Sequence, residues 1–273
     1  MKELMLFNIH HNCLTLSPEP STVFYAEGCR FHCNGCLYWE GHDKLKFFNI
    51  AVDDAVDTVI EHKSQCIVLS GGNPLLQAEP FLEMVEKVKA IKDVGLIIYC
   101  GETREELDAM TSVDCPEARL LAHADIIISG RYEPENDVGN AMVGSSNQHV
   151  EFVTTRYSAY KELYEVRDRK IEVEFSYNEP GMSYSGVPTA AQRRFFSRMG
   201  QTARGDSIPA CPRDVSVYHL SVDTFMLAME GASIAIVELG EERVRITIKP
   251  IRDDQIDSLI KALLYLLGGE GDV

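Results

Sequence analysis

Residues 66–92 read CIVLSGGNPLLQAEPFLEMVEKVKAIK, and this stretch decides the fold. Its first four residues form a uniformly apolar run that ends at two glycines, and residues 80–92 then place apolar side chains at helical spacing. A run that is apolar on both faces is typical of a strand buried within a parallel sheet, and the spacing that follows indicates a helix covering that sheet. The stretch therefore predicts one strand, loop and helix unit.

The same unit recurs through the first half of the chain. Apolar runs that end at a turn glycine lie at 23–25, 66–69, 96–99 and 124–128. Helical spacing of apolar residues separates them at 51–62, 80–92 and 104–110. Strands alternating with helices predict an α/β fold with a parallel sheet, here a partial (open) parallel β/α barrel. Because ligands bind such sheets at the carboxyl ends of the strands, the loops after these runs are the expected site.

The second half of the chain has a different pattern. Residues 170–177 alternate as a strand does, and residues 189–199 suggest a short helix. A polar stretch with glycine and proline at 200–214 is a candidate linker. Strand patterns at 233–237 and 244–248 then precede a helical pattern at 254–267. We therefore predict a barrel domain over 1–199 and a small C-terminal α+β appendage over 200–273.

Composition limits the classes of partner. Hydrophobic residues make up 45% of the chain and charged residues 25%, as in a soluble globular protein. The formal net charge of -16 repels phosphate backbones, so we expect no nucleic-acid partner. We recognise neither a signal peptide nor a stretch that would span a bilayer, so the sequence predicts a cytoplasmic protein without a membrane partner.

Three of the eight cysteines lie in the loop after the first apolar run. Cys29, Cys33 and Cys36 have the spacing C-x3-C-x2-C, which lets three thiolates converge on one metal centre. A four-iron cubane has four corners, so three thiolates leave one iron open for a substrate. A structural zinc site with Cys13 or His32 as its fourth ligand is an alternative, as are three buried thiols without a metal.

The motifs as a group resemble the radical S-adenosylmethionine (SAM) superfamily, over about residues 5 to 190. The cysteine loop carries the superfamily's signature, residues 69–76 (LSGGNPLL) resemble its Gly-Gly-Glu-Pro motif, and residues 99–103 (YCGET) resemble Tyr-Thr-Gly-Tyr-Thr. Residues 130–132 (GRY) and 144–148 (GSSNQ) are similar to a later segment of the small branch that contains the activating protein of anaerobic ribonucleotide reductase. Two positions depart from that pattern, with Asn73 in place of Glu and Glu102 in place of an aromatic residue.

The resemblance implies a [4Fe-4S] cluster and SAM as cofactors. It implies reductive cleavage of SAM to a 5′-deoxyadenosyl radical, with electrons from a low-potential donor such as flavodoxin or ferredoxin. The radical would activate a partner by installing a glycyl radical, as an activase of the ribonucleotide reductase type does. A radical enzyme acting on a small molecule or peptide is the alternative, and a non-catalytic iron-sulfur or zinc protein is a third class. An exposed cluster also predicts sensitivity to oxygen.

The resemblance also assigns residues to the SAM site. The segment Ser70-Gly71-Gly72-Asn73 would meet the methionine amino group, since glycine allows close approach of the backbone, although a tight turn explains the same residues. Tyr38 would contact adenine. Arg131 would pair with the methionine carboxylate, or else form an ion pair with Glu133 or Glu135. Ser146 and Gln148, with Asn147 between them, would bind the ribose, although such residues also form ordinary loops.

Overall fold

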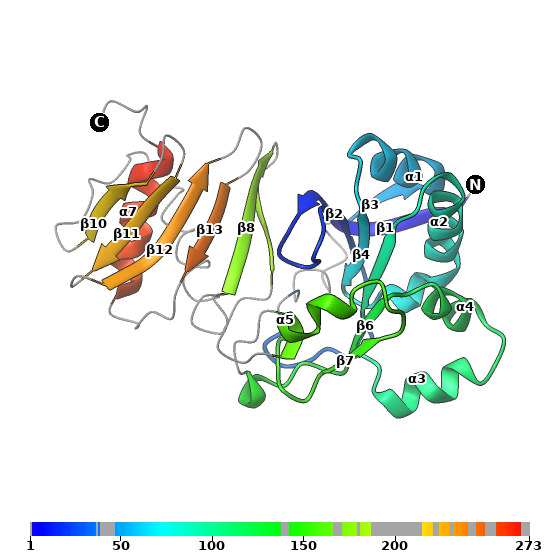
Figure 1. The fold of residues 1–273 in the computed structure, drawn as a ribbon. Helices are drawn as coiled ribbons and strands as arrows, with labels where there is room; N and C mark the ends of the chain where they lie inside the picture. Colours follow the sequence, from blue (N-terminus) through cyan, green and yellow to red (C-terminus); the bar gives the residue numbers. More distant parts are fainter. Residues whose placement is uncertain are drawn as a thin grey trace. The chain divides into compact units, whose positions relative to one another are not determined.

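The computed structural model comprises two compact units, residues 1–167 and 168–273. It describes residues 2–36, 38, 47–137, 142–165, 171–178, 181–186, 215–220, 224–229, 232–239, 244–248 and 255–268. Most helices and strands of both units are labelled in Figure 1. No helix in the described ranges is both long and apolar enough to cross a bilayer.

A seven-stranded sheet forms the first unit, in the order β3-β1-β2-β4-β5-β6-β7. Its four central strands run parallel to one another, and they are β2 (Ser21–Ala26), β4 (Cys66–Gly71), β5 (Gly95–Tyr99) and β6 (Ile126–Ser129). The flanking strands pair antiparallel, and they are β1 (Glu3–Cys13), β3 (Phe48–Ala51) and β7 (His149–Phe152). The predicted α/β fold with a partial parallel barrel is therefore confirmed, within a mixed sheet.

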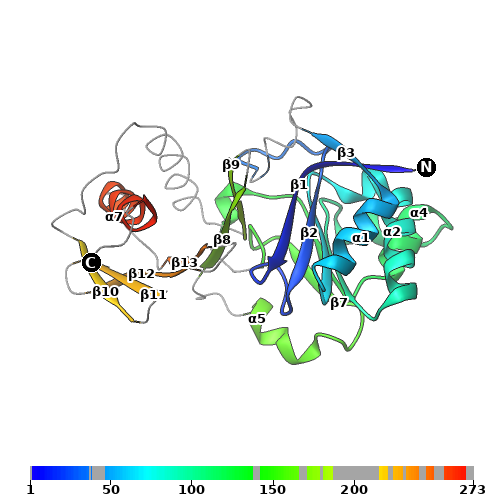
Figure 2. The same cartoon turned by 90° about the horizontal axis from the view of Figure 1, so that it is seen from above.

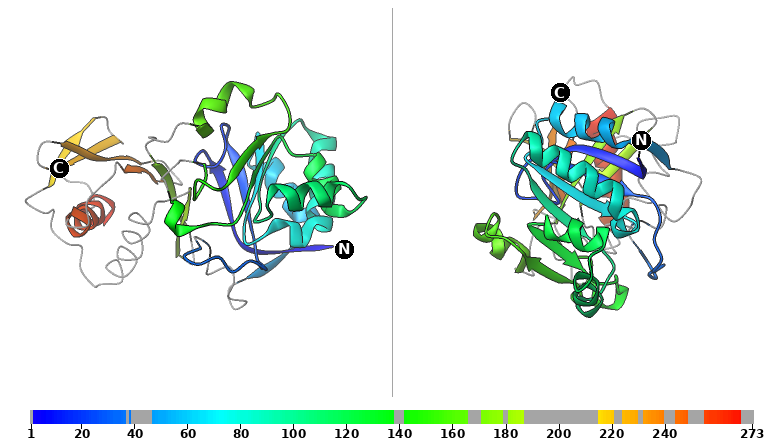
Figure 3. Two further views of the ribbon diagram at one scale, coloured as in Figure 1. Left: turned by 90° about the horizontal axis from the view of Figure 1, so that it is seen from below. Right: turned by 90° about the vertical axis from the view of Figure 1, so that its right-hand side faces the viewer.

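Helices cover one face of this sheet. Three of them lie together on that face (Figures 2 and 3), namely α1 (Val52–Glu61), α2 (Ala78–Ile91) and α4 (Pro116–Ala122). The remaining helices of the unit are α3 (Arg104–Thr111) and α5 (Lys161–Glu165), with 3-10 turns η2 (Pro74–Gln77), η3 (Pro134–Asn136) and η4 (Ser158–Tyr160). The helices predicted at 51–62, 80–92 and 104–110 are present with slightly different ends.

The core lies between the sheet and these helices. Register pairs Phe24 of β2 with Leu69 of β4, and Leu69 with Ile98 of β5, so three fully buried side chains form a row on one face. Apolar residues of α2 such as Phe81 and Val85 pack against the same cluster. Because the alternate residues of these strands are buried as well, the sheet is covered on both faces, which explains its uniformly apolar runs.

The second unit contains a six-stranded antiparallel sheet in the order β10-β11-β12-β13-β8-β9. Its strands are β8 (Ile171–Asn178), β9 (Gly181–Ser185), β10 (Val215–His219), β11 (Thr224–Met229), β12 (Ala232–Leu239) and β13 (Val244–Ile248). Helix α7 (Ile256–Gly268) lies beside β10 to β12, as Figure 1 shows. The strands and the helix predicted near the C-terminus are thus present.

The division between the units falls earlier than the predicted boundary at 199/200. Strand β8 pairs with β13 over residues 171–175, so it is part of the second sheet and not an extension of the barrel. The C-terminal unit accordingly begins at Asp168. The short helix predicted at 189–199 and the linker predicted at 200–214 lie outside the described residues.

Candidate iron-sulfur site

The cysteine loop follows β2 at the edge of the sheet where the parallel strands end. Cys29, Cys33 and Cys36 are each half-buried, and none forms a disulfide. The Cys36 amide donates a hydrogen bond to the Cys33 carbonyl (3.2 Å), which closes a turn around Gly35 at φ 66°. The backbone thus brings the second and third thiols onto one tight turn, as their short spacing predicts.

The loop after β4 holds the start of the cysteine loop by its backbone. The Gly72 amide donates to Ala26 (2.8 Å) and the Asn73 amide donates to Gly28 (2.8 Å), which continues the ladder beyond the paired strands. A β-carbon on Gly72 would lie 2.2 Å from the Gly28 carbonyl oxygen. One on Gly71 would lie 2.7 Å from the Ala26 nitrogen. The two glycines are thus required by contact between protein segments, a reason that the sequence does not reveal.

The loops after β5 and β6 enclose Phe31, which lies between Cys29 and Cys33. A β-carbon on Gly101 would be 2.3 Å from the Phe31 ring, so glycine allows the ring to pack on the backbone there. On another side, the Arg131 guanidinium lies 4.5 Å from the ring centroid, a cation-π contact. The aromatic side chain therefore links the cysteine loop to two neighbouring loops.

Arg131 forms an ion pair, but not with the partners that the sequence suggested. Its Nη2 donates to Glu106 Oε1 at 2.8 Å, in place of Glu133 or Glu135. This hydrogen bond raises the pKa of Arg131, and the nearby Cys33 and Glu102 add to the rise. Glu106 also accepts from the Thr103 amide (2.8 Å) in the capping box that begins α3. The charge of Arg131 is therefore close to the cysteine loop and partly engaged.

A partly buried ion pair and a hydrogen bond join the cysteine loop to the loops after β4 and β5. Glu102, only 1% exposed, accepts from Arg30 Nη2 and from Asn73 Nδ2, both at 2.8 Å and both on Oε1. Asn73 is fully buried, and its Oδ1 accepts from the Leu75 amide (3.3 Å), so it also caps η2. Asn73 and Glu102, the two residues that depart from the family pattern, are thus in contact.

The second oxygen of Glu102 has no hydrogen-bond partner in the described part of the chain. The thiol of Cys100 is near enough that Glu102, after burial itself, raises the pKa of this cysteine. A buried acceptor left unpaired costs about 1–3 kcal/mol, more when it is charged, so this oxygen calls for a ligand or a function.

The polar residues of 144–148 fold the loop between β6 and β7 onto itself. Gln148 Oε1 accepts from the amides of Gly144 (2.7 Å) and Ser145 (3.2 Å), and its Nε2 donates to Gly130 (2.9 Å). Asn147 Nδ2 donates to the Arg131 carbonyl (2.8 Å). Gln148 and Asn147 therefore have structural partners, as the ordinary-loop alternative expects.

Three further predicted residues lie around this edge. Ser146 is exposed, and its amide donates to Asn136 (2.8 Å). Ser70 is buried near the end of β4, opposite Tyr25 of β2. Tyr38 is half-buried with its ring centroid 5.1 Å from that of Tyr25. Each of these residues is thus at or near the predicted edge, without a contact in the structure that assigns it to a cofactor.

The donor chemistry of the loop fits an iron-sulfur cluster. Within the described ranges, no three His, Cys, Asp or Glu side chains lie close enough to hold a single metal ion. A cubane is larger, and each of three thiolates would bind a different iron. The contacts at Gly72 and Gly101 fix the position of this loop by protein groups.

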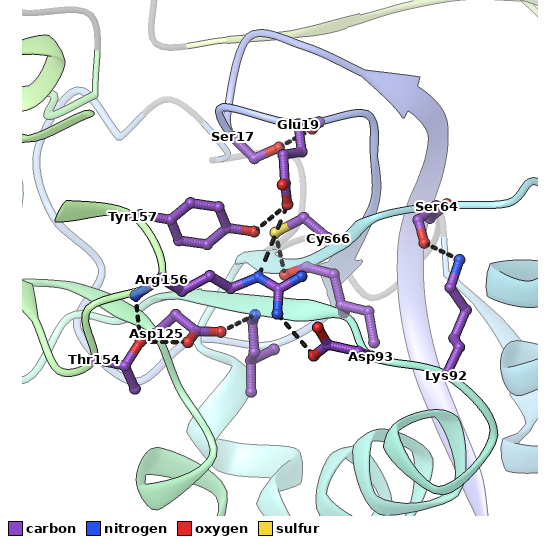
Figure 4. Close-up of polar contacts among 12 residues, drawn as sticks. Ser17, Glu19, Ser64, Cys66, Lys92, Asp93, Asp125, Thr154, Arg156 and Tyr157 are labelled. Carbon is purple, nitrogen blue, oxygen red and sulfur yellow. Dashed lines mark hydrogen bonds and ion pairs between the residues drawn. The ribbon is translucent and has the colours of Figure 1, made fainter. Parts of the chain in front are cut away.

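The opposite edge of the sheet has a separate polar network (Figure 4). Buried Tyr157 donates to Glu19 (2.8 Å) and lies beside Cys66, whose pKa burial raises to about 12. Arg156 donates a hydrogen bond to the Asp93 carboxylate (2.7 Å), and the Leu96 amide donates one to the Asp125 carboxylate (2.9 Å). These contacts join the amino ends of the strands. Cys66 is therefore part of a structural network. These contacts lie away from the loops that form the site.

Comparison with known families agrees with this geometry. Residues 20–151 match the family described as 4Fe-4S single cluster domain, a span that begins just before β2 and ends within β7. This part of the chain therefore matches a 4Fe-4S domain, in agreement with the resemblance to the radical SAM superfamily.

One curated relative is the anaerobic ribonucleoside-triphosphate reductase-activating protein of Enterobacteria phage T4. It is 25% identical to this chain over 139 residues, which make up 49% of this chain and 84% of that protein. The similarity thus extends over most of the relative and about half of this chain.

Proposed function

We propose that the first unit holds a [4Fe-4S] cluster through Cys29, Cys33 and Cys36 and cleaves SAM reductively. The observation that carries this proposal is the convergence of the loops after β4, β5 and β6 on the cysteine loop, in a domain of the 4Fe-4S single cluster family. Convergence at the carboxyl ends of parallel strands is where such sheets bind their ligands.

When bound, the reduced cluster supplies one electron to the sulfonium, so that a carbon-sulfur bond breaks to give methionine and a 5′-deoxyadenosyl radical. The protein's task is to hold and orient the reactants. The thiolates of Cys29, Cys33 and Cys36 would hold the cluster, and an iron without a protein ligand would be available to the amino acid end of SAM. Arg131, already beside Cys33, is the candidate for its carboxylate, and Tyr38 is the candidate for adenine. A low-potential electron donor such as flavodoxin or ferredoxin is required.

The radical's target in this proposal is a glycine of a partner enzyme. Hydrogen would move from the glycine to the radical, leaving 5′-deoxyadenosine and a glycyl radical. Support comes from the curated relative, which is named as an activating protein of a reductase. A small-molecule or peptide substrate is the second candidate, because the whole second unit lies outside the matched span.

Product analysis tests the radical chemistry. After anaerobic reconstitution and dithionite reduction, chromatography should detect 5′-deoxyadenosine in the wild type and none with Cys33→Ala. The control Cys115→Ser removes a thiol far along the chain, at the start of α4, and should keep the product. A full complement of iron without the product, or zinc in the protein prepared without air, would contradict the proposal.

A second assay separates the two targets. The reduced protein with SAM is mixed with a glycyl-radical enzyme of the ribonucleotide reductase type. Electron paramagnetic resonance should then show a glycyl radical. Continued formation of 5′-deoxyadenosine without any glycyl radical signal would favour the small-molecule alternative.

A further inference from the structure

Two residues that depart from the family pattern compensate for one another. Asn73 brings an amide where the motif of strand β4 has a carboxylate, and Glu102 brings a carboxylate where the next motif has an aromatic ring. Asn73 Nδ2 donates to Glu102 Oε1 at 2.8 Å, so the two side chains form one buried pair. The carboxylate is thus retained at this edge of the sheet but is supplied by the loop after β5.

The pair leaves one strong acceptor unused. Arg30 and Asn73 both bind Oε1 of Glu102, while Oε2 is buried without a hydrogen-bond partner among the described residues. An ionised carboxylate accepts hydrogen bonds at both oxygens and donates none. The group that completes this site must therefore be a donor, and a cationic donor makes the strongest bond.

The charges around Glu102 favour a ligand that carries both signs. Arg30 pairs with Glu102 directly, and Arg131 lies close enough that Glu102 contributes to raising its pKa. A simple cation would meet these two guanidinium groups, whereas a simple anion would meet the buried carboxylate. The ammonium and carboxylate of an α-amino acid match this arrangement, since each finds an opposite charge. Both groups are present at the methionine end of SAM.

We propose that Glu102 is the acceptor for the ammonium group of SAM, with Asn73 orienting its carboxylate. The inference rests on the proposed function and names a residue of that same site. Arg30, from the cysteine loop, holds Oε1 of Glu102, and its own side chain is 53% exposed. The ammonium would bind the unused oxygen, Oε2, while Arg30 and Asn73 keep Oε1.

Exchange of the two side chains tests the assignment. The dissociation constant of SAM is measured by equilibrium dialysis on the reconstituted, cluster-loaded protein, with iron content and thermal midpoint recorded for every variant. Glu102→Gln should raise the constant about tenfold or more, as loss of a charged hydrogen bond does. The double variant Asn73→Glu with Glu102→Gln returns a carboxylate to the buried pair and should recover most of the affinity. Glu105→Gln, an exposed neighbour in the first turn of α3, should bind as the wild type does.

The electron paramagnetic resonance spectrum of the reduced cluster gives a readout independent of turnover. SAM should change this spectrum in the wild type and the double variant, and much less in Glu102→Gln. Wild-type affinity in Glu102→Gln would overturn the inference. Loss of iron and of thermal stability in both variants would do so as well, because the carboxylate would then serve the loop alone. SAM that binds through Glu102 but is never cleaved would instead refute the proposed function and leave this inference standing.

Discussion

The backbone of Gly72 lies so close to Gly28 that a β-carbon there would be 2.2 Å from the carbonyl oxygen. No side-chain rotation relieves such a contact, because the backbone fixes the position of a β-carbon and the carbonyl oxygen belongs to the main chain. Gly28 itself has φ 90° but no atom within 4 Å of an added β-carbon. The two glycines are thus required for different reasons. Gly72 is required because there is no space for a β-carbon, and Gly28 because its backbone has a positive φ.

Alanine at these positions should separate the two effects. Gly72→Ala must displace the start of the cysteine loop, so we expect a loss of about 3 kcal/mol in unfolding free energy and a lower iron content after reconstitution. Gly28→Ala adds only backbone strain of about 1 kcal/mol. Urea unfolding and iron analysis measure these effects in both variants. Equal losses of unfolding free energy in Gly72→Ala and Gly28→Ala would contradict the proposed contact.

His11 makes stability depend on pH. Burial, and then the nearby His62 and His10, lower the pKa of His11 from 6.5 to about 4, and its ring stacks on His62 at 3.8 Å. Since the unfolded chain binds the proton more readily, unfolding free energy should fall as pH drops from about 6.5 toward 4. Over that pH range, the unfolding free energy of His11→Gln should fall by about 1 to 3 kcal/mol less than that of the wild type.

Urea titrations at a series of pH values measure this slope. The control His149→Gln removes an exposed histidine at the start of β7 and should keep the wild-type slope. A wild-type slope in His11→Gln would show that other groups control the acid response.

Among the secondary-structure elements, the parallel strands were predictable and the flanking ones were not. Strands β2, β4, β5 and β6 are uniformly apolar because both faces of the sheet are covered, and this pattern is visible in the sequence. Strand β1 mixes buried and exposed residues along its length, and β3 and β7 have four residues each. Their pairing depends on contacts distant in the chain, so no local pattern reveals them.

Only part of the candidate site could be predicted from the sequence, for the same reason. Spacing alone identified the three cysteines, and turn glycines indicated which loops would surround them. The roles of Arg30 and Phe31 were missed, because a cation-π contact and a partly buried ion pair join residues from different loops. The compensating change at Asn73 and Glu102 was visible as two departures, but only the fold places them 2.8 Å apart.

The segment before η4 anchors the amino ends of the parallel strands. Tyr157 is buried, and its hydroxyl donates to Glu19 at 2.8 Å. Tyr157→Phe removes this bond and should cost about 1–2 kcal/mol of unfolding free energy. Because the network lies at the edge opposite the cysteine loop, iron content and SAM affinity should not change.

Tyr160→Phe provides the matched control, since that ring is 38% exposed. It should unfold as the wild type does. If Tyr157→Phe instead lowered SAM affinity without affecting stability, the separation between the two edges would be refuted.

For the whole molecule, the two compact units suggest separate tasks. The family match over residues 20–151 lies entirely within the first unit, which ends at Arg167. We expect a fragment of residues 1–167 to fold and, after reconstitution, to bind about four irons per chain, because all three proposed ligands are within it.

Circular dichroism and iron analysis on that fragment provide the measurement. Insolubility, or a folded fragment without iron, would contradict this assignment. If the fragment also cleaves SAM but no longer transfers the radical to its target, the unit that begins at Asp168 selects the target.

The two backbone hydrogen bonds from Gly72 and Asn73 have a consequence for maturation. They order the chain just ahead of Cys29 using protein groups alone, unlike small zinc modules that fold only around their metal. Delivery of iron and sulfide would therefore act on a chain that is already folded at this edge. A cluster destroyed by air could then be rebuilt on the same polypeptide, without its degradation and new synthesis.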